Sequence, residues 1–477
     1  MLEGLIMKIS LVNPPPVKGK KYIREGRCMQ SINSWAAIWP PLTLAILATI
    51  AREYGEVDLF DCNVEDDYDV AKTVQRVQVF NPEVVVVNTS FPSIEGDEGC
   101  AEAIKNASPS VLIVGFGVFF TLLDERALQA CPAFDVGISG EPEITFKDIL
   151  EKVANQDVVA TLPGLMWREG KAIVCGKRRP FIENLDKLPF AARDLLRNNR
   201  YILPHNGHPF TLINVARGCP YPCTYCISPV YYGKKVRRHS HEYILDEMEY
   251  CKKEHKIFDF LFWEEIFTLD RDFGIGLCEA IGRKGWNVSW ATTTRADCVD
   301  KEILITMKKN GCSLLGLGLE TTHQHILDNA NKNESVDDIR RAVELCKEVG
   351  LKTMGHFIFG LPGETPETAH ETIMSAREFG LDYMQCYAAV PYPKTSLGEM
   401  AREKGWITSE KWADYDFGGR SILDTGTISP EEVDRARTNM FRKFYFRLGY
   451  ILKQLGMLIT HPRQMVQASK FLKWMKS

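Results

Sequence analysis

The sequence lacks a strong excess of charge of either sign. Its 477 residues carry 58 Lys and Arg against 62 Asp and Glu, a net charge of −4, so no nucleic-acid partner is expected. It also lacks a secretory signal and a transmembrane segment, and it contains 14 cysteines, which together predict a reducing, cytoplasmic location. With 45% hydrophobic and 25% charged residues, the chain is long enough for two or three globular domains.

Histidine is absent before His205, and no second C-x2-C pair occurs anywhere. Three cysteines nevertheless stand together as C-x3-C-x2-C, directly after an apolar run at 212–216 that predicts a strand: Cys219, Cys223 and Cys226. Three thiolates on one loop can hold three irons of a 4Fe–4S cube and leave the fourth iron open. An open iron can chelate a small molecule through amine and carboxylate groups.

Two other uses of these cysteines are weaker. A structural zinc site needs four ligands, usually from two pairs, and the nearest histidine, His239, has no partner cysteine. Disulfides are not expected in a chain of this size without a secretory signal. The cysteines outside the motif are scattered and are expected to be small buried residues.

The first part of the chain alternates strands and helices. Strands are predicted at 7–13, 57–61, 83–89, 111–115 and 136–140, with helices between most of them, which indicates a doubly wound, Rossmann-like parallel sheet. Ligands bind such sheets at the carboxyl ends of the strands, where four candidate residues fall: Gly115, Gly117, Gly140 and Glu141. From the residues alone, tight turns are the favoured explanation of these glycines.

A second alternation follows. Six strands are predicted at 211–216, 258–262, 288–293, 313–319, 353–359 and 383–389, which indicates a partial (βα)6 barrel with its working residues at the carboxyl strand ends. Those ends carry further candidates: Glu264, Glu265, Arg295, Glu320, Gly360 and Gly363. Helix capping and turn geometry are the alternative explanations. His356, on the fifth strand, is either a core histidine or one that faces the interior of the barrel. Tyr387 and Tyr392, near the end of the sixth strand, are expected either in the substrate wall or in a packed loop.

The segment from Arg217 to Cys226 resembles the cluster loop of radical S-adenosylmethionine (SAM) enzymes. The resemblance implies a cluster whose open iron binds SAM and cleaves it to a 5′-deoxyadenosyl radical. It also implies that Tyr225 packs near the adenine, that Glu264 and Glu265 match a pair of acids after the second strand, and that Arg295 and Glu320 contact SAM. Gly360 and Gly363 would let backbone approach the adenine.

The N-terminal half resembles the cobalamin-binding domain of one radical SAM subfamily. The strand followed by Asn13-Pro14-Pro15 and the later Gly140-Glu141-x-Glu143 carry this resemblance. Because no histidine precedes His205, the resemblance implies a cobalt without a histidine ligand from this domain. The alternative is a domain that has kept the fold and lost the cofactor.

The resemblance implies a radical SAM enzyme, with a 4Fe–4S cluster, SAM and cobalamin as cofactors, that methylates an unactivated carbon. Oxidative cyclisation or ring rearrangement of a tetrapyrrole- or lipid-like substrate, as in the anaerobic magnesium-protoporphyrin ester cyclase branch, is the alternative. A cobalamin or iron–sulfur sensor is a third reading, which the polar barrel rim disfavours. An external electron donor, flavodoxin or ferredoxin, and a small-molecule or lipid-like substrate are the expected partners.

The predicted domains are a cobalamin-binding domain at 7–155, a connector at 156–205, a barrel at 206–400 and a helical region at 401–477. From Arg435 to the end the sequence has no Asp or Glu, while basic and aromatic residues interleave. Such a basic helical tail can lie on an anionic bilayer, so peripheral contact with the inner membrane face is one expectation. Packing on the barrel through its apolar face is the other.

Overall fold

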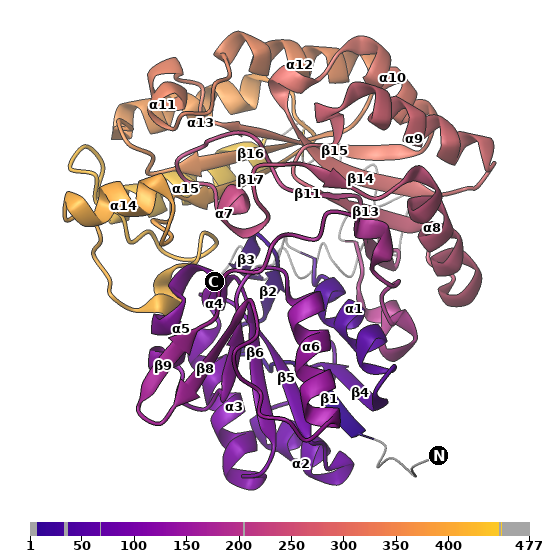
Figure 1. Cartoon of the computed structure of the whole chain (residues 1–477). Helices are drawn as coiled ribbons and strands as arrows, with labels where there is room; N and C mark the ends of the chain where they lie inside the picture. Colours follow the sequence, from indigo (N-terminus) through magenta and orange to yellow (C-terminus); the bar gives the residue numbers. More distant parts are fainter. Residues whose placement is uncertain (1–6, 33–36, 67, 204–205, 448–449, 451–477) are drawn as a thin grey trace.

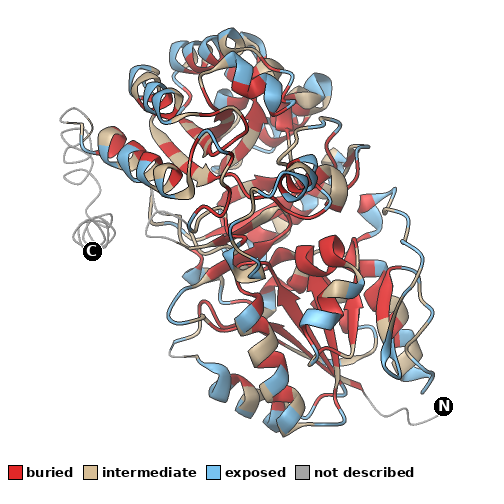
Figure 2. Ribbon diagram, turned by 90° about the vertical axis from the view of Figure 1, so that its left-hand side faces the viewer, coloured by how far each residue is buried: buried red, intermediate tan, exposed pale blue. Residues whose placement is uncertain are grey.

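A computed structural model describes residues 7–32, 37–66, 68–203, 206–447 and 450. Two α/β units lie one above the other, with the N-terminal unit below and the C-terminal unit above in the view of Figure 1. The strands of both units are mostly buried and the outer faces of their helices are exposed (Figure 2). Among the described residues, no helix is both long and apolar enough to span a bilayer.

The N-terminal unit is built on a seven-stranded sheet. The order is β4 (Gly55–Asp61), β1 (Met7–Asn13), β5 (Val84–Thr89), β6 (Leu112–Gly117), β7 (Val136–Ile138), β8 (Leu165–Glu169) and β9 (Ala172–Cys175). The first five strands are parallel. Strands β8 and β9 form a hairpin that joins β7 in antiparallel fashion. A hairpin inside the expected connector therefore continues this sheet.

Helices cover both faces of the N-terminal sheet. They are α1 (Leu42–Ala51), α2 (Val70–Phe80), α3 (Ile94–Ala107), α4 (Val118–Leu123), α5 (Glu125–Ala130) and α6 (Pro142–Ala154). In β5, Val84 and Val86 pack in the core that contains α1 and α6, whereas Val85 and Val87 pack in the core that contains α3. A strand buried on both faces requires such a continuous apolar run. The predicted doubly wound sheet is confirmed.

The C-terminal unit is a six-stranded parallel sheet in sequence order. Its strands are β10 (Phe210–Asn214), β13 (Asp259–Trp263), β14 (Ser289–Arg295), β15 (Cys312–Glu320), β16 (Thr353–Phe359) and β17 (Tyr383–Ala388). The helices between and after them are α8 (His241–His255), α9 (Arg271–Arg283), α10 (Lys301–Lys309), α11 (Gln324–Asn329), α12 (Val336–Val349), α13 (Pro366–Glu378), α14 (Ser396–Glu403) and α15 (Pro430–Tyr445). The predicted partial barrel is confirmed.

Alternation along the barrel strands separates an outer from an inner face. Phe357 and Phe359 of β16 pack in the core between sheet and helices. Because neighbouring side chains of a strand point to opposite faces, His356 lies on the inner face of the barrel. A Cβ on Gly316 of β15 would come 3.0 Å from His356 Nε2, which places this imidazole over the neighbouring strand.

A hairpin that the sequence did not predict lies between the two units. It consists of β2 (Tyr22–Glu25) and β3 (Cys28–Ser31), and Figure 1 shows it above the carboxyl ends of β5 and β6. Asn88, in β5, donates a 3.1 Å hydrogen bond to the Arg24 carbonyl. The Arg24 guanidinium forms a fully buried 2.8 Å ion pair with Asp97. The hairpin is thus anchored in the N-terminal unit, and its tip points toward the barrel.

The start of the C-terminal region packs on the barrel. Helix α15 contacts β17 and α13 and buries Val433, Met440 and Phe444. Arg447, just after the helix, donates a 2.9 Å hydrogen bond to the Arg377 carbonyl. This part of the basic tail therefore uses its apolar face against the barrel. The prediction of membrane contact concerns mostly residues 451–477, which lie outside the described residues.

Candidate active site

The cysteine loop follows β10 and the short β11 (Ala216–Arg217), at the carboxyl end of the first barrel strand. Gly218 has φ of +100°, and a Cβ there would come 2.2 Å from the Lys235 carbonyl oxygen, so only glycine fits. Backbone hydrogen bonds hold the loop, from Cys219 N to Gly233 O at 3.0 Å and from Thr224 N to Ala330 O at 2.9 Å. Backbone hydrogen bonds to residues outside the loop therefore hold its conformation.

The three thiols fit a cluster better than a single metal ion. Burial, with a smaller contribution from the Glu265 charge, raises the pKa of Cys219 to about 11 and of Cys226 to about 12. Binding iron would deprotonate them, because the thiolate is the metal ligand. No three His, Cys, Asp or Glu side chains within the described ranges surround a point where one ion could sit. Three thiols on one loop are the donor set that holds three irons of a 4Fe–4S cluster, so the residues present fit that group.

A buried charge cluster lies at the ends of β14 and β15. Lys332 Nζ donates hydrogen bonds to Glu320 Oε1 at 2.7 Å and to the Gly318 carbonyl at 2.8 Å, and it lies 3.4 Å from Glu334 Oε2. Glu320 has φ of +60°, the left-handed region that is uncommon for a side chain larger than glycine. Burial first, and then the Glu320 charge, hold the pKa of the Tyr225 phenol far above its usual value. Glu320 and Tyr225 therefore lie close together, and the prediction that they contact SAM stays a prediction.

Arg295 already has a carboxylate partner. Its guanidinium pairs with Asp297 through two hydrogen bonds of 2.8 and 2.9 Å and lies over the Tyr221 ring, 3.7 Å from the centroid. A contact with the SAM carboxylate would use the donors that this pair leaves free. The prediction that Arg295 holds that carboxylate stays a prediction.

The two adjacent acids after β13 have different environments. Glu264 is buried beside Thr292, 3.5 Å from the hydroxyl oxygen, and burial raises its pKa to about 8. Glu265 forms an ion pair with Arg27 of the hairpin tip. Arg27 also lies over the Trp263 ring, 4.9 Å from its centroid. Only Glu265 therefore pairs with the cation that the N-terminal unit inserts beside the cysteine loop.

Packing accounts for most of the predicted glycines. A Cβ would lie 2.3 Å from the Phe120 ring at Gly115, 2.3 Å from the Thr89 carbonyl at Gly117, and 2.5 Å from Asn329 Nδ2 at Gly363. Gly360 has φ of +88°, with Val433 3.2 Å from its notional Cβ. Gly140, with φ of +87°, has no atom within 4 Å of such a Cβ. Among these five, only Gly140 combines a positive φ with open space for a ligand.

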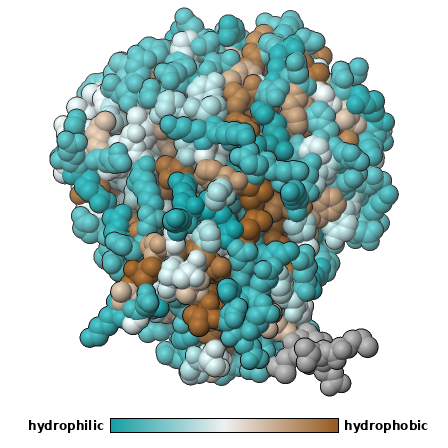
Figure 3. Space-filling view, viewed as in Figure 1, coloured by the Kyte–Doolittle hydropathy of each residue, from teal (hydrophilic) through white to brown (hydrophobic). Residues whose placement is uncertain are grey.

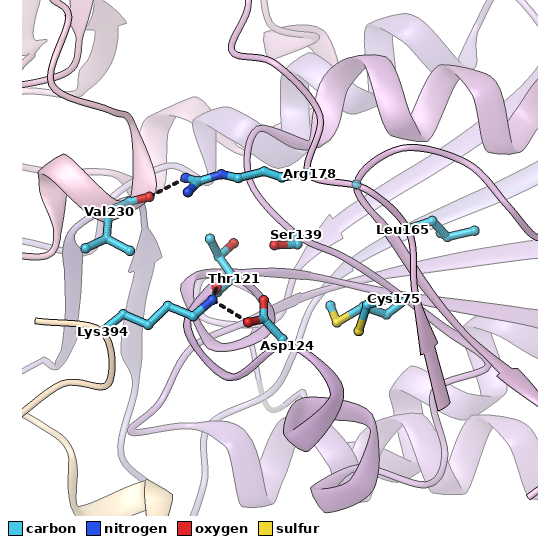
Figure 4. Close-up of a pocket in the computed structure, with 11 residues that line it drawn as sticks. Thr121, Asp124, Ser139, Leu165, Cys175, Arg178, Val230 and Lys394 are labelled. Atoms are coloured by element: carbon cyan, nitrogen blue, oxygen red, sulfur yellow. Dashed lines mark hydrogen bonds and ion pairs between the residues drawn. The ribbon is translucent and has the colours of Figure 1, made fainter. Parts of the chain in front are cut away.

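Between the two units, near Gly140, lies a cavity of about 180 Å³. Figure 4 shows Thr121, Asp124 and Ser139 from the N-terminal unit facing Val230 and Lys394 from the C-terminal unit. Lys394 forms a 2.6 Å ion pair with Asp124, and Arg178 donates a 2.6 Å hydrogen bond to the Val230 carbonyl. Both cations already have protein partners, so only their remaining N–H groups are left for the amide or phosphate groups at the edge of cobalamin. The cavity is smaller than pockets that enclose a whole ligand, so it fits only part of that cofactor.

Glu141 extends away from this cavity. Its carboxylate pairs with two arginines of the C-terminal unit, Arg217 at 3.1 Å and Arg237 at 2.9 Å. Glu143 pairs with Arg217 at 2.6 Å. The predicted cobalamin contact of Glu141 stays a prediction, but its carboxylate has other partners.

Several residues of the site had no signal in the sequence. Lys332 follows a helix without a motif, and Arg27 lies in a segment without periodicity.

His356 Nδ1 lies 3.2 Å from the Tyr387 hydroxyl, which donates a 2.6 Å hydrogen bond to Gln385 Oε1. Burial lowers the pKa of His356 to about 4, so this inner-face histidine is neutral. Strand alternation could have placed His356, Gln385 and Tyr387 on one face of the sheet, but it could not have predicted the hydrogen bonds between them.

Comparisons with known proteins agree with this geometry. The radical SAM superfamily model matches residues 213–376, and the B12 binding domain model matches residues 32–150. An uncharacterized methyltransferase of Pyrococcus horikoshii is 28% identical over 94% of this chain and 95% of its own length. The anaerobic magnesium-protoporphyrin IX monomethyl ester cyclase of Rubrivivax gelatinosus is 26% identical over 87% of this chain and 75% of its own length.

Among solved structures, the radical SAM methyltransferase TsrM of Kitasatospora setae superposes with a TM-score of 0.69. It is 20% identical and covers 85% of this chain and 79% of its own. The likeness extends over both units and supports the same fold. With the three-cysteine loop on a partial barrel and a Rossmann-like domain against its mouth, the chain belongs to the B12-binding radical SAM enzymes, whose cofactors are a 4Fe–4S cluster, SAM and cobalamin.

Proposed function

We propose that this enzyme is a methyltransferase that acts on an unactivated carbon of a small molecule. The observation that carries the proposal is the match to an uncharacterized methyltransferase, over 94% of this chain and 95% of the relative. The cyclase relative has further length that this chain does not match, since only 75% of it is covered. The fuller match to the relative named a methyltransferase therefore supports methyl transfer over cyclisation.

The chain's own residues have distinct parts in this proposal. Cys219, Cys223 and Cys226 hold the cluster, and Glu320 and Tyr225 flank the bound SAM. When bound, the cluster supplies the electron that cleaves SAM to a 5′-deoxyadenosyl radical and methionine, and cobalamin supplies the methyl group. The substrate occupies the inner face of the barrel near His356. An external one-electron donor of the flavodoxin or ferredoxin type completes the system.

The barrel interior supports a protected reaction space. The hairpin tip inserts Arg27 over Trp263 from the N-terminal unit, and Trp39 lies edge-on to Trp263 with centroids 5.3 Å apart. Aromatic rings at the junction of the two units exclude water from the space between them. Exclusion of water prevents quenching of reactive intermediates.

The two candidate reactions can be distinguished without knowing the substrate. A cobalamin-dependent methyltransferase transfers a methyl group from SAM to reduced cobalamin and releases S-adenosylhomocysteine, whereas cyclisation requires no such transfer. We would reconstitute the protein anaerobically with iron, sulfide and cobalamin, add SAM and a reductant, and measure S-adenosylhomocysteine and 5′-deoxyadenosine by mass spectrometry. Release of both supports the proposal. Release of 5′-deoxyadenosine alone would favour the cyclase alternative, and release of neither would overturn both.

A further inference from the structure

Two carboxylates at the start of α6 bind arginines of the other unit. Glu141 immediately precedes the helix and Glu143 lies in its first turn. Glu141 accepts hydrogen bonds from Arg217 at 3.1 Å and Arg237 at 2.9 Å, and Glu143 accepts one from Arg217 at 2.6 Å. The four side chains are 5% exposed or less. Charged groups this deeply buried are retained only when they are paired.

Both arginines belong to the frame of the cluster loop. Arg217 and Arg237 face each other in the antiparallel pair of β11 and β12 (Arg237–Arg238). Arg217 is separated from Cys219 only by Gly218, where a Cβ would come 2.2 Å from the Lys235 carbonyl oxygen. The two carboxylates therefore bind both β11, which leads into the loop, and β12, which follows it.

The far side of the loop is also anchored in the N-terminal unit. Directly after the third cysteine, Ile227, Tyr231 and Tyr232 pack in the apolar core that contains α3 and α4. Helix α7 (Ser228–Tyr231) contacts α4. Arg237 donates a 2.8 Å hydrogen bond to the Tyr232 carbonyl, which joins this apolar anchor to the charged one. The cysteines thus lie between two attachments to the cobalamin domain.

We propose that Glu141 and Glu143 are positioning residues that hold the cluster loop in register with the cobalamin domain. The ion pairs fix where the loop lies relative to the strand ends of the N-terminal sheet. Because a carboxylate and a guanidinium fork match in shape as well as charge, the pairs set an orientation and not only an attraction. This role rests on the family assignment and holds for either methyl transfer or cyclisation.

The test uses Glu143→Gln and Glu141→Gln in the full chain, reconstituted anaerobically with iron, sulfide and hydroxocobalamin. Glu53→Gln is the matched control, because Glu53 is 59% exposed and pairs with Lys147 on the surface of the same unit. The readouts are iron content, cobalamin retained on gel filtration, the electron paramagnetic resonance spectrum of the reduced cluster with and without SAM, and the rate of 5′-deoxyadenosine release.

We expect both variants to retain iron and cobalamin within twofold of the parent. Their cluster spectra should broaden, their response to SAM should fall, and 5′-deoxyadenosine release should drop at least tenfold, whereas Glu53→Gln should match the parent. Unchanged spectra with an unchanged rate would overturn the proposal. Loss of cobalamin with an unchanged cluster spectrum would also overturn it, and would make these carboxylates cofactor ligands.

A third variant keeps the proposal testable if Glu141→Gln and Glu143→Gln do not fold. Arg217→Lys keeps the positive charge but removes the planar fork, so the domain junction stays neutral while its orientation is no longer fixed. We expect a folded protein with parental iron content and a smaller change in the same spectral and kinetic readouts. A parental spectrum and rate in folded Arg217→Lys would contradict the positioning role. None of these readouts depends on S-adenosylhomocysteine, so failure here is distinguishable from failure of the proposed methyl transfer.

Discussion

Replacing Lys332 by Met should both destabilise the barrel and weaken SAM binding. The ammonium of Lys332 is 3% exposed at the side chain, pairs with Glu320 at 2.7 Å, and lies 3.4 Å from the fully buried Glu334. Its removal leaves two carboxylates without their cation. Removing one partner of a buried ion pair costs about 3–5 kcal/mol, because the remaining charge is uncompensated.

The expected loss of stability can be measured as a thermal shift. In a unit of 150–250 residues each kcal/mol lowers the melting temperature by about 2–4 °C, so the barrel transition should fall by on the order of 10 °C. Burial already raises the pKa of Glu334, and without the Lys332 charge this carboxyl should bind its proton more tightly still. The loss should therefore be larger at pH 8, where ionisation is forced, than at pH 5.

Two further variants separate this mechanism from general damage. Lys301→Met removes an exposed 3.0 Å pair with Glu348 and should cost less than about 1 kcal/mol, as surface pairs do. Adding Glu320→Gln to Lys332→Met should recover part of the stability but not SAM affinity, measured by anaerobic equilibrium dialysis. A shift below about 1 kcal/mol for Lys332→Met, or unchanged SAM affinity, would refute the reasoning.

Three other changes test the site. Cys223→Ala should lower iron content and abolish 5′-deoxyadenosine release, whereas alanine at the exposed Cys175 should change neither, and a Cys223 variant with parental release would contradict the ligand assignment. Glu264→Gln should stabilise the protein relative to the parent above about pH 5. The carboxyl pKa is raised from 4.5 to about 8 in the fold, so the parent loses up to about 1.4 kcal/mol of its free energy of unfolding per pH unit between those values. An equal pH dependence of the free energy of unfolding in variant and parent from pH 5 to 8 would contradict this prediction. Arg27→Gln should shift the cluster potential downward, because a positive charge leaves the vicinity of Cys219 and Cys226, and the double variant with Glu265→Gln should return it toward the parental value in a spectroscopic redox titration.

The sequence predicted the fold because the relevant signals are local. The valines of β5 and the apolar stretches of the barrel strands identify buried parallel strands, and the strand–helix alternation then leaves few topologies. The three cysteines were equally accessible, since their spacing lies within one loop. Glu320 and Tyr225 were found by matching positions, and the structure brings them together.

Partners that are distant in the sequence could not be predicted. The Glu141–Arg217 contact joins residues 76 positions apart, and no periodicity relates them. The β2–β3 hairpin is short and carries charged residues at Arg24, Glu25 and Arg27, so its pattern is that of a loop. Its strand pairing depends on buried partners in β5 and α3, which only the folded chain supplies.

The choice between reactions is expected to depend on the barrel's inner face and not on the cofactor residues. Relatives with different chemistry share 26% and 28% identity with this chain over most of its length, so the cofactor framework is common to both. His356, Gln385 and Tyr387 form a hydrogen-bonded set on β16 and β17, the strands farthest in the sheet order from β10, which precedes the cysteine loop. A neutral histidine in such a set can donate or accept a hydrogen bond but brings no charge, which suits a weakly polar substrate held for hydrogen abstraction. The face shown in Figure 3 is largely hydrophilic with smaller hydrophobic areas.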